Sequence, residues 1–262
     1  MHARGMLLWL AAAWLLGGSA LAGQSCEPRQ PKPAEIRSGL ALAYKVRQQL
    51  DAQGARVAVI GRVGRDLSEY GLRYSHIGLA VRDDASGRWS VVHELNLCGR
   101  ADSELYDQGL GNFFLDDLFR VEAIVLVPSS EVQDRLAVAI ANGAGHRLHE
   151  RSYSLIAHPY SAKYQNSNQW LLEFAAAILA GGEPTRQAAH ARLVRDGFIP
   201  SVLYLPPLKR LGARLFSVNT RFDDHSVEEW RTSRYQVVSA ESVFAWFARA
   251  DRRMGQSVLT LQ

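Results

Sequence analysis

Apolar positions recur along this chain with the two periods that distinguish helices from strands. The helical spacing of Ile36, Leu40 and Leu50 predicts an amphipathic helix over 34–53, which Gly54 ends. The same spacing predicts five further helices, over the ranges 131–142, 167–179, 184–196, 208–216 and 240–252. The sequence thus predicts six helices.

Shorter apolar runs indicate strands between these helices. Two-residue alternation predicts a hairpin of strands over 72–81 and 89–95. Further strands are predicted over the ranges 57–60, 121–127 and 235–238. The glycines of segment 109–114 predict a loop or turn, and Ser129 or Ser130 is expected to cap the helix that follows the fourth strand. Together these elements predict an α+β fold.

The first 22 residues have the pattern of an export signal. A weakly basic start precedes an apolar run over 6–16, and the small residues Ala20 and Ala22 predict cleavage after Ala22. We therefore expect the mature protein in the periplasm; a retained N-terminal anchor is the alternative. No later stretch is long and apolar enough to cross a bilayer.

Composition narrows the class of protein only modestly. The chain has 262 residues, 47% of them hydrophobic, and a formal net charge of +4 without a Lys/Arg block, so we expect no nucleic-acid partner. In an oxidising compartment the two cysteines, Cys26 and Cys98, predict one disulfide. The alternative is that Cys98 is a nucleophile.

The predicted hairpin carries two histidines that we expect to meet. His76, Gly78 and Ala80 share one face of the first strand, where the small residues leave room for a helix. An even turn places His93 of the second strand beside His76, whereas an odd turn places Glu94 there. We favour His93 as the group that orients the His76 ring. A purely structural role for His76 and a two-histidine metal site are the alternatives.

Ser167 opens one of the predicted helices, with Asn166 in the capping position. It shares a helix face with Trp170 and Phe174, so its hydroxyl should point where the apolar stripe points, toward the sheet. Unpaired N–H groups in the first turn can hold an oxyanion there. The alternative is that Ser167 is only a capping residue.

Over nearly the whole mature length, the chain resembles an exported bacterial family known as domain of unknown function 2145. Four blocks carry the resemblance, at residues 74–78, 111–117, 164–170 and 207–212. This resemblance implies no activity.

A more distant resemblance, over 57–180, is to the permuted NlpC/p60 branch of papain-like hydrolases. In that branch a strand histidine placed like His76 precedes the nucleophile, and a polar residue placed like His93 orients it. The nucleophile opens a helix as Ser167 does, but there it is a cysteine. The resemblance implies an antiparallel sheet with helices packed on it, formed by 23–182, with 183–262 as a C-terminal extension packed on this core. The flanking residues expected to line the pocket are Asn166, Asn168, Tyr74 and Tyr164.

Two functional hypotheses follow from this frame. The first is a non-catalytic, degenerate module that binds a cell-envelope peptide or protein. The second is a serine-dependent amidase or esterase in which Ser167 attacks, His76 acts as general base and His93 orients it. We favour the first, because serine rarely replaces a thiolate without a rebuilt base.

No cofactor or metal is expected under either hypothesis. Asp116 with Asp117, and Asp223 with Asp224 and His225, resemble metal-ligand clusters, but neighbouring aspartates in loops are more often turn residues. The basic amphipathic segment 208–216 is expected to be a solvated helix face; contact with an anionic membrane is the alternative.

Overall fold

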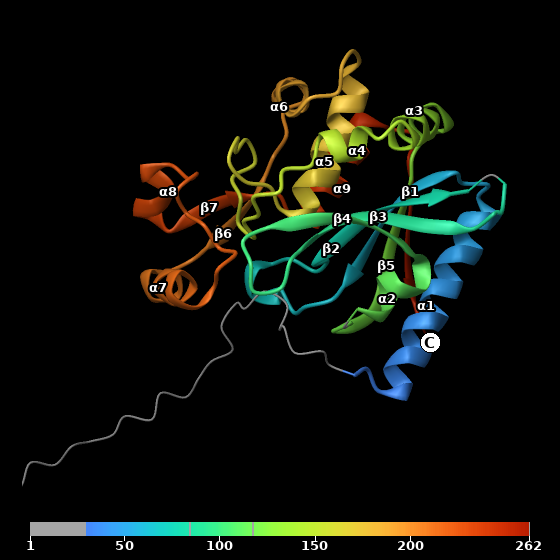
Figure 1. Ribbon diagram of the computed structural model, residues 1–262, viewed down its shortest axis with the longest axis horizontal. Helices are drawn as coiled ribbons and strands as arrows, with labels where there is room; N and C mark the ends of the chain where they lie inside the picture. The colour runs from blue at the N-terminus through green and yellow to red at the C-terminus, as the bar shows by residue number, and fades with distance from the viewer. Residues whose placement is uncertain (1–29, 84, 117, 262) are drawn as a thin grey trace, which may run out of the picture.

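The structure, a computed structural model, describes residues 30–83, 85–116 and 118–261. It has three layers, with one sheet between two groups of helices (Figure 1). The predicted signal peptide, its cleavage site and Cys26 lie outside the described residues, so export and the Cys26–Cys98 disulfide stay predictions. Among the described residues, no helix combines the length and the apolar composition that a membrane span requires.

The central sheet has six strands in the order β4-β3-β2-β1-β5-β8, and every neighbouring pair is antiparallel. The strands are β1 (Val57–Val63), β2 (His76–Arg82), β3 (Trp89–Asn96), β4 (Ser103–Gly109), β5 (Arg120–Val127) and β8 (Gly255–Thr260). The predicted α+β class and antiparallel sheet are confirmed.

Two helices cover one face of the sheet, α1 (Pro33–Ala52) and α2 (Leu110–Leu115). The apolar stripe of α1 packs on alternate sheet residues such as Ile60 and Ala80, together with Phe113 of α2. We call this side of the sheet the α1 face.

Four helices cover the opposite side, which we call the α5 face. They are α3 (Ser130–Ala141), α4 (Ala144–Arg147), α5 (Ser167–Ala180) and α9 (Ala240–Ala250). Helix α6 (Arg186–Arg195) packs against α5. Trp170 and Phe174 of α5 belong to the same core as Ile77 and Leu79 of β2, so the larger of the two cores lies on this side.

A small lobe lies to one side of the sheet (Figure 1). It consists of a two-stranded sheet, β6 (Ser201–Tyr204) with β7 (Arg234–Val237), and of α7 (Pro207–Phe216) and α8 (Val227–Thr232). Tyr235 and Val237 form its core with Ile156, and the short helix η1 (Ser68–Tyr70) contributes Tyr70.

One expectation about the elements was wrong. Segment 109–114 is not a loop, because Gly109 ends β4 and α2 begins at Leu110. The last strand of the predicted C-terminal extension, β8, pairs with β5 and completes the main sheet. Strands β4, β6 and β8 and the short helix α8 were not predicted.

Candidate functional site

The two predicted histidines lie side by side on the α1 face. The Leu79–Val92 pairing places His93 opposite Gly78, as the even-turn register predicts, and His76 Nε2 lies 2.8 Å from His93 Nδ1. His93 Nε2 lies 3.3 Å from the side-chain oxygen of Gln108 on β4. Because that oxygen only accepts, His93 donates to Gln108 and accepts from His76 Nε2–H. This arrangement fixes the tautomer of each ring when both rings are neutral.

The surroundings of this pair favour the uncharged rings. The ring of Phe113 stacks on His76 and meets His93 edge to face. Burial, followed by the nearby Arg62 charge, holds the pKa of His76 well below its usual range and lowers the pKa of His93 to about 4. The pair is therefore uncharged at neutral pH.

Arg62 is the charged group nearest to these histidines. It donates to the Phe113 carbonyl at 2.5 Å and to the Asp116 carbonyl at 2.9 Å, and it forms an ion pair with the Asp116 carboxylate. Asp116 thus has a structural partner; Asp117 lies outside the described residues. Over the described parts of the chain, no group of three His, Cys, Asp or Glu residues is arranged to hold a metal ion.

Ser167 lies on the other side of the sheet from the histidines. It opens α5, which packs on the face that carries Ile77 and Leu79, whereas His76 and Gly78 point to the α1 face. The structure therefore brings His76 and His93 together and does not bring Ser167 to them. The histidine most suited to act as a base is separated from the serine by the sheet itself.

The start of α5 is occupied by protein groups. Asn166 caps the helix by accepting from Gln169 N–H at 2.9 Å, and its own amide donates to the Val238 carbonyl at 3.4 Å. Burial raises the pKa of the Tyr153 phenol, and interactions of its oxygen with the hydroxyl and backbone N–H of Ser167 partly oppose that shift. Two of the first three N–H groups of α5 are thus engaged, and an oxyanion at Ser167 would have to displace Tyr153.

Glu94 is a functional candidate that the sequence analysis did not favour, since it preferred His93. It is fully buried, and neither of its carboxyl oxygens has a hydrogen-bond partner among the residues that the structure describes. Burial raises its pKa to about 8, against the opposing effect of the nearby Ser103 hydroxyl. Its charge also acts on Tyr153, whose oxygen interacts with Ser167. The position of Glu94 could have been predicted from strand alternation, because the residues directly before and after His93 in β3 must point to the α5 face.

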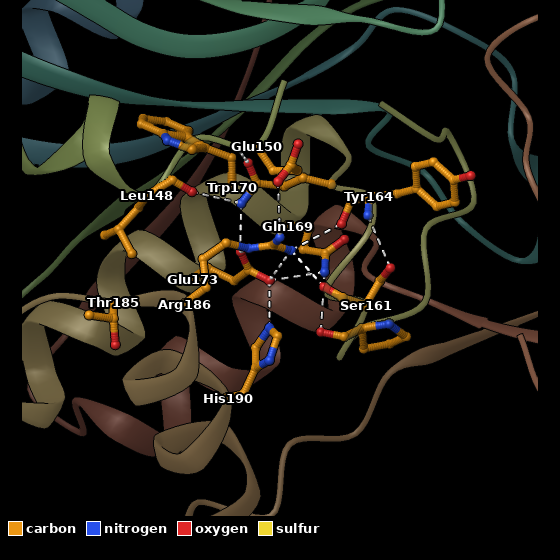
Figure 2. A network of polar contacts seen from close by, with 12 residues as sticks. Leu148, Glu150, Ser161, Tyr164, Gln169, Trp170, Glu173, Thr185, Arg186 and His190 are labelled. Atoms are coloured by element: carbon orange, nitrogen blue, oxygen red, sulfur yellow. Dashed lines mark hydrogen bonds and ion pairs between the residues drawn. The ribbon is translucent and has the colours of Figure 1, made fainter. Parts of the chain in front are cut away.

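A second buried carboxylate, Glu173, is saturated with donors (Figure 2). It accepts from Gln165 at 2.5 Å, from Gln169 at 3.0 Å, from Arg186 at 2.7 Å and from His190 at 2.8 Å. These contacts join α5, α6 and the segment before α5. Since every contact is with a protein group, the network holds the helices together and leaves little capacity for a ligand.

The remaining residues expected at the pocket have separate surroundings. Tyr74 donates to Glu122 at 2.8 Å and packs edge-on against Phe244. Tyr164 donates to Asp223 at 3.0 Å near the surface. The side-chain oxygen of Asn168 is buried and has no hydrogen-bond partner among the described residues.

A groove of about 500 Å³ lies on the α5 face, between the sheet and α3–α4. Its floor consists of partly buried apolar side chains from three adjacent strands, Val81, Val92 and Leu105. Its wall consists of α3 and α4, which contribute the lining residues Ala137, Val138, Ile140, Ala141, Gly145 and His146. This groove is open, whereas Tyr153 occupies the space in front of Ser167.

The family described as "Uncharacterized protein conserved in bacteria (DUF2145)" matches residues 49–247, more than half of the chain. The chain belongs to this family. The family segment begins inside α1 and ends inside α9, so it contains both histidines, Glu94 and Ser167, and it leaves out β8. No curated protein and no solved structure matches the chain.

Proposed function

We propose that the protein is an exported, non-catalytic module that binds an extended peptide of the cell envelope. The observation that carries this proposal is the open groove between α3–α4 and strands β2–β4, which has an apolar floor and a charged rim. The geometry around Ser167 adds support, because its hydroxyl faces Tyr153 and both histidines lie across the sheet.

The edge of the sheet supports an extended ligand in particular. Strand β4 is an edge strand with β3 as its one neighbour. Its first residues are covered, since Ser103 N–H donates to the Arg151 carbonyl at 2.9 Å and Tyr153 N–H donates to the Ala101 carbonyl at 2.8 Å. From residue 104 onward, no strand among the described residues pairs with its outer backbone groups, so they can accept a further strand.

The chemistry of the groove supports a peptide as the ligand. Apolar side chains at alternate positions of an added strand would pack on Leu105 and Val92, and Arg82 and Asp107 offer both charges at the rim. The groove thus suits a short peptide with alternating apolar and charged residues, as opposed to a lipid chain or a nucleotide.

The test uses end-capped hexapeptides with apolar residues alternating with Lys or Asp, and their binding is measured by fluorescence polarisation. Ala141→Trp places an indole in the groove from an exposed helix position, and we expect it to weaken binding at least tenfold, about 1.4 kcal/mol. Ala191→Trp, on the exposed side of α6 and outside the groove, is the matched control. Ser167→Ala should bind like the wild type. Absence of binding across the panel, or equal loss in both tryptophan variants, would refute the proposal.

A serine-dependent hydrolase is the second candidate, and Glu94 is the observation that favours it. Its carboxyl group and the Ser167 hydroxyl both act on Tyr153 from the same side of the sheet. Because the pKa of Glu94 is about 8, it would serve as a base mainly at alkaline pH. Labelling by a fluorophosphonate probe at pH 9 but not at pH 6, abolished by Ser167→Ala and by Glu94→Gln, would establish this candidate over the non-catalytic module.

A further inference from the structure

Helix α7 carries its leucines on the outside of the protein. Leu208, Leu211 and Leu215 lie at positions i, i+3 and i+7, so they form one stripe, and their exposed fractions are 81%, 53% and 65%. None of the described side chains of α7 is buried. A soluble helix of this length usually turns such a stripe toward the core.

Two of the three basic residues of α7, Lys209 and Arg210, contact the body of the protein instead. The Arg210 guanidinium lies 4.2 Å from the centre of the Trp230 ring and donates to the Trp230 carbonyl at 2.6 Å and to the Tyr235 hydroxyl at 2.9 Å. Lys209 forms an ion pair with Glu69. The helix is thus fixed to the lobe through its polar side, and its leucine stripe is held outward.

The exposed leucines belong to a wider concentration of apolar surface. Of the sixteen large hydrophobic residues that are exposed in the described chain, nine lie between residues 199 and 230. They are Ile199, Val202, Tyr204, Leu208, Leu211, Leu215, Val218, Val227 and Trp230. Exposed apolar residues gathered in the lobe of α7, α8 and β6–β7 are typical of an interaction surface. Figure 1 shows this lobe to one side of the main sheet.

The charges on α7 indicate which kind of partner the leucine stripe contacts. Residues 207–216 contain three basic residues and no acidic residue. Among the described residues, neither Arg210 nor Arg214 has a carboxylate partner within ion-pair distance, and Arg214 is exposed beside Leu215. Arg214, whose guanidinium lies 5.8 Å from the centre of the Trp230 ring, is thus an exposed cation beside a row of exposed leucines. This arrangement complements a surface with anionic groups above an apolar layer, and that is an anionic lipid membrane.

We propose that α7 docks the protein on an anionic membrane surface. The leucine stripe enters the boundary between head groups and acyl chains, and the exposed Arg214 lies at the level of the lipid phosphates. Helix α7 and the wall helix α3 of the groove lie on opposite sides of the molecule in Figure 1, so the groove stays accessible in the docked protein. The proposal does not depend on what the groove binds.

Co-sedimentation of the full chain with vesicles tests this proposal. One vesicle type is phosphatidylcholine alone, and the other contains one quarter phosphatidylglycerol. We expect binding to the second type that weakens with added salt. Leu208→Gln, Leu211→Gln and Leu215→Gln combined should reduce it at least tenfold. Arg214→Gln should reduce it about fivefold, the effect of one cation near an anionic surface.

The matched control replaces exposed apolar residues elsewhere, Val194→Gln on α6 and Val258→Gln on β8. It should bind vesicles like the wild type, and all variants should keep the wild-type circular dichroism spectrum. Equal binding to both vesicle types, or full binding by the leucine variant, would overturn the proposal. So would leucine-dependent self-association without vesicle binding, which would assign the stripe to a second copy of the chain.

Discussion

Gly78 is the residue on which the packing around the two histidines depends. A Cβ atom at this position would lie 2.5 Å from a Val91 methyl, 3.1 Å from the Phe113 ring and 3.4 Å from the Cβ of His93. The sequence predicted that this small-residue face leaves room for a helix, and α2 with Phe113 fills that room. The contacts therefore explain why glycine stands beside the histidine pair.

We expect Gly78→Ala to lower the free energy of unfolding by about 1–3 kcal/mol, because Val91 and Phe113 must move. Urea denaturation followed by tryptophan fluorescence measures this change. Gly109→Ala is the control, since a Cβ there meets no atom within 4 Å and its φ of −63° suits alanine. Equal stability of the two variants would show that Gly78 is not tightly packed.

Glu94 should make stability depend on pH in a defined direction. The pKa of its carboxyl group is raised by burial to about 8 from an ordinary value of 4.5. Between these values the folded protein retains a proton that the unfolded chain releases, so the stability of the wild type falls as pH rises. The low pKa of His93 acts oppositely, but only as pH falls below 6.5 toward about 4.

Glu94→Gln removes the fall in stability that the raised pKa of Glu94 causes as pH rises, and it leaves the histidines unchanged. We expect the free energy of unfolding of this variant, relative to wild type, to rise between pH 5 and 8 by up to about 1.4 kcal/mol per pH unit and then to level off. Denaturation at four pH values from 5 to 9 measures it. The exposed Glu183→Gln should track the wild type. A pH-independent difference for Glu94→Gln would contradict a raised pKa.

At the scale of elements, the long periodic helices and the buried strands could be predicted from the sequence. α1, α3, α5, α6, α7 and α9 and strands β1, β2, β3, β5 and β7 all lie where periodicity placed them, within a few residues. The missed strands β4 and β8 are the two edges of the sheet. An edge strand has one neighbour and more solvent, so polar residues such as Glu104 and Gln256 interrupt its apolar alternation.

The relation between the histidines and Ser167 could not be predicted in the same way. Helical periodicity gives the face of α5 that meets the sheet, but it does not say which face of the sheet α5 covers. The small face beside His76 fits Phe113 of the short helix α2 as well as it fits α5. Tertiary packing alone decides between them, and it places α5 on the side of Ile77.

The cap of α5 offers an element-scale test. The Asn166 side chain is buried, accepts from Gln169 N–H and donates to the Val238 carbonyl. We expect Asn166→Ala to lower the free energy of unfolding by about 1–2 kcal/mol, since both contacts are lost. Ser129→Ala is the control, because the Ser129 hydroxyl stands at the cap position of α3 without a hydrogen-bond partner among the described residues.

Thermal unfolding of the two cap variants separates their roles. Asn166→Ala should melt several degrees lower, whereas Ser129→Ala should melt near or above the wild type, since it removes a buried hydroxyl without a partner. A larger loss for Ser129→Ala would show that α3 depends on its cap and α5 does not.

The C-terminal segment adds a helix to the core and an edge strand to the main sheet. α9 brings Phe244, Trp246 and Phe247 to the core on the α5 face. Beyond the family segment, β8 covers the open edge of β5 in six paired positions from residue 122 to residue 127. Since β5 is almost continuously apolar, its edge would otherwise be an aggregation site.

Removing residues 253–262 tests that role and keeps Asp251, whose carboxylate accepts from Ser129 N–H at 2.6 Å. We expect the free energy of unfolding to fall by at least about 2 kcal/mol, because each lost ladder bond contributes on the order of 1 kcal/mol. We also expect self-association, measured by sedimentation velocity, since β5 becomes an edge. Val258→Lys in the full chain, at a half-exposed position, should change neither quantity much. A truncated protein that remains monomeric and equally stable would mean that β8 adds nothing to the sheet it borders.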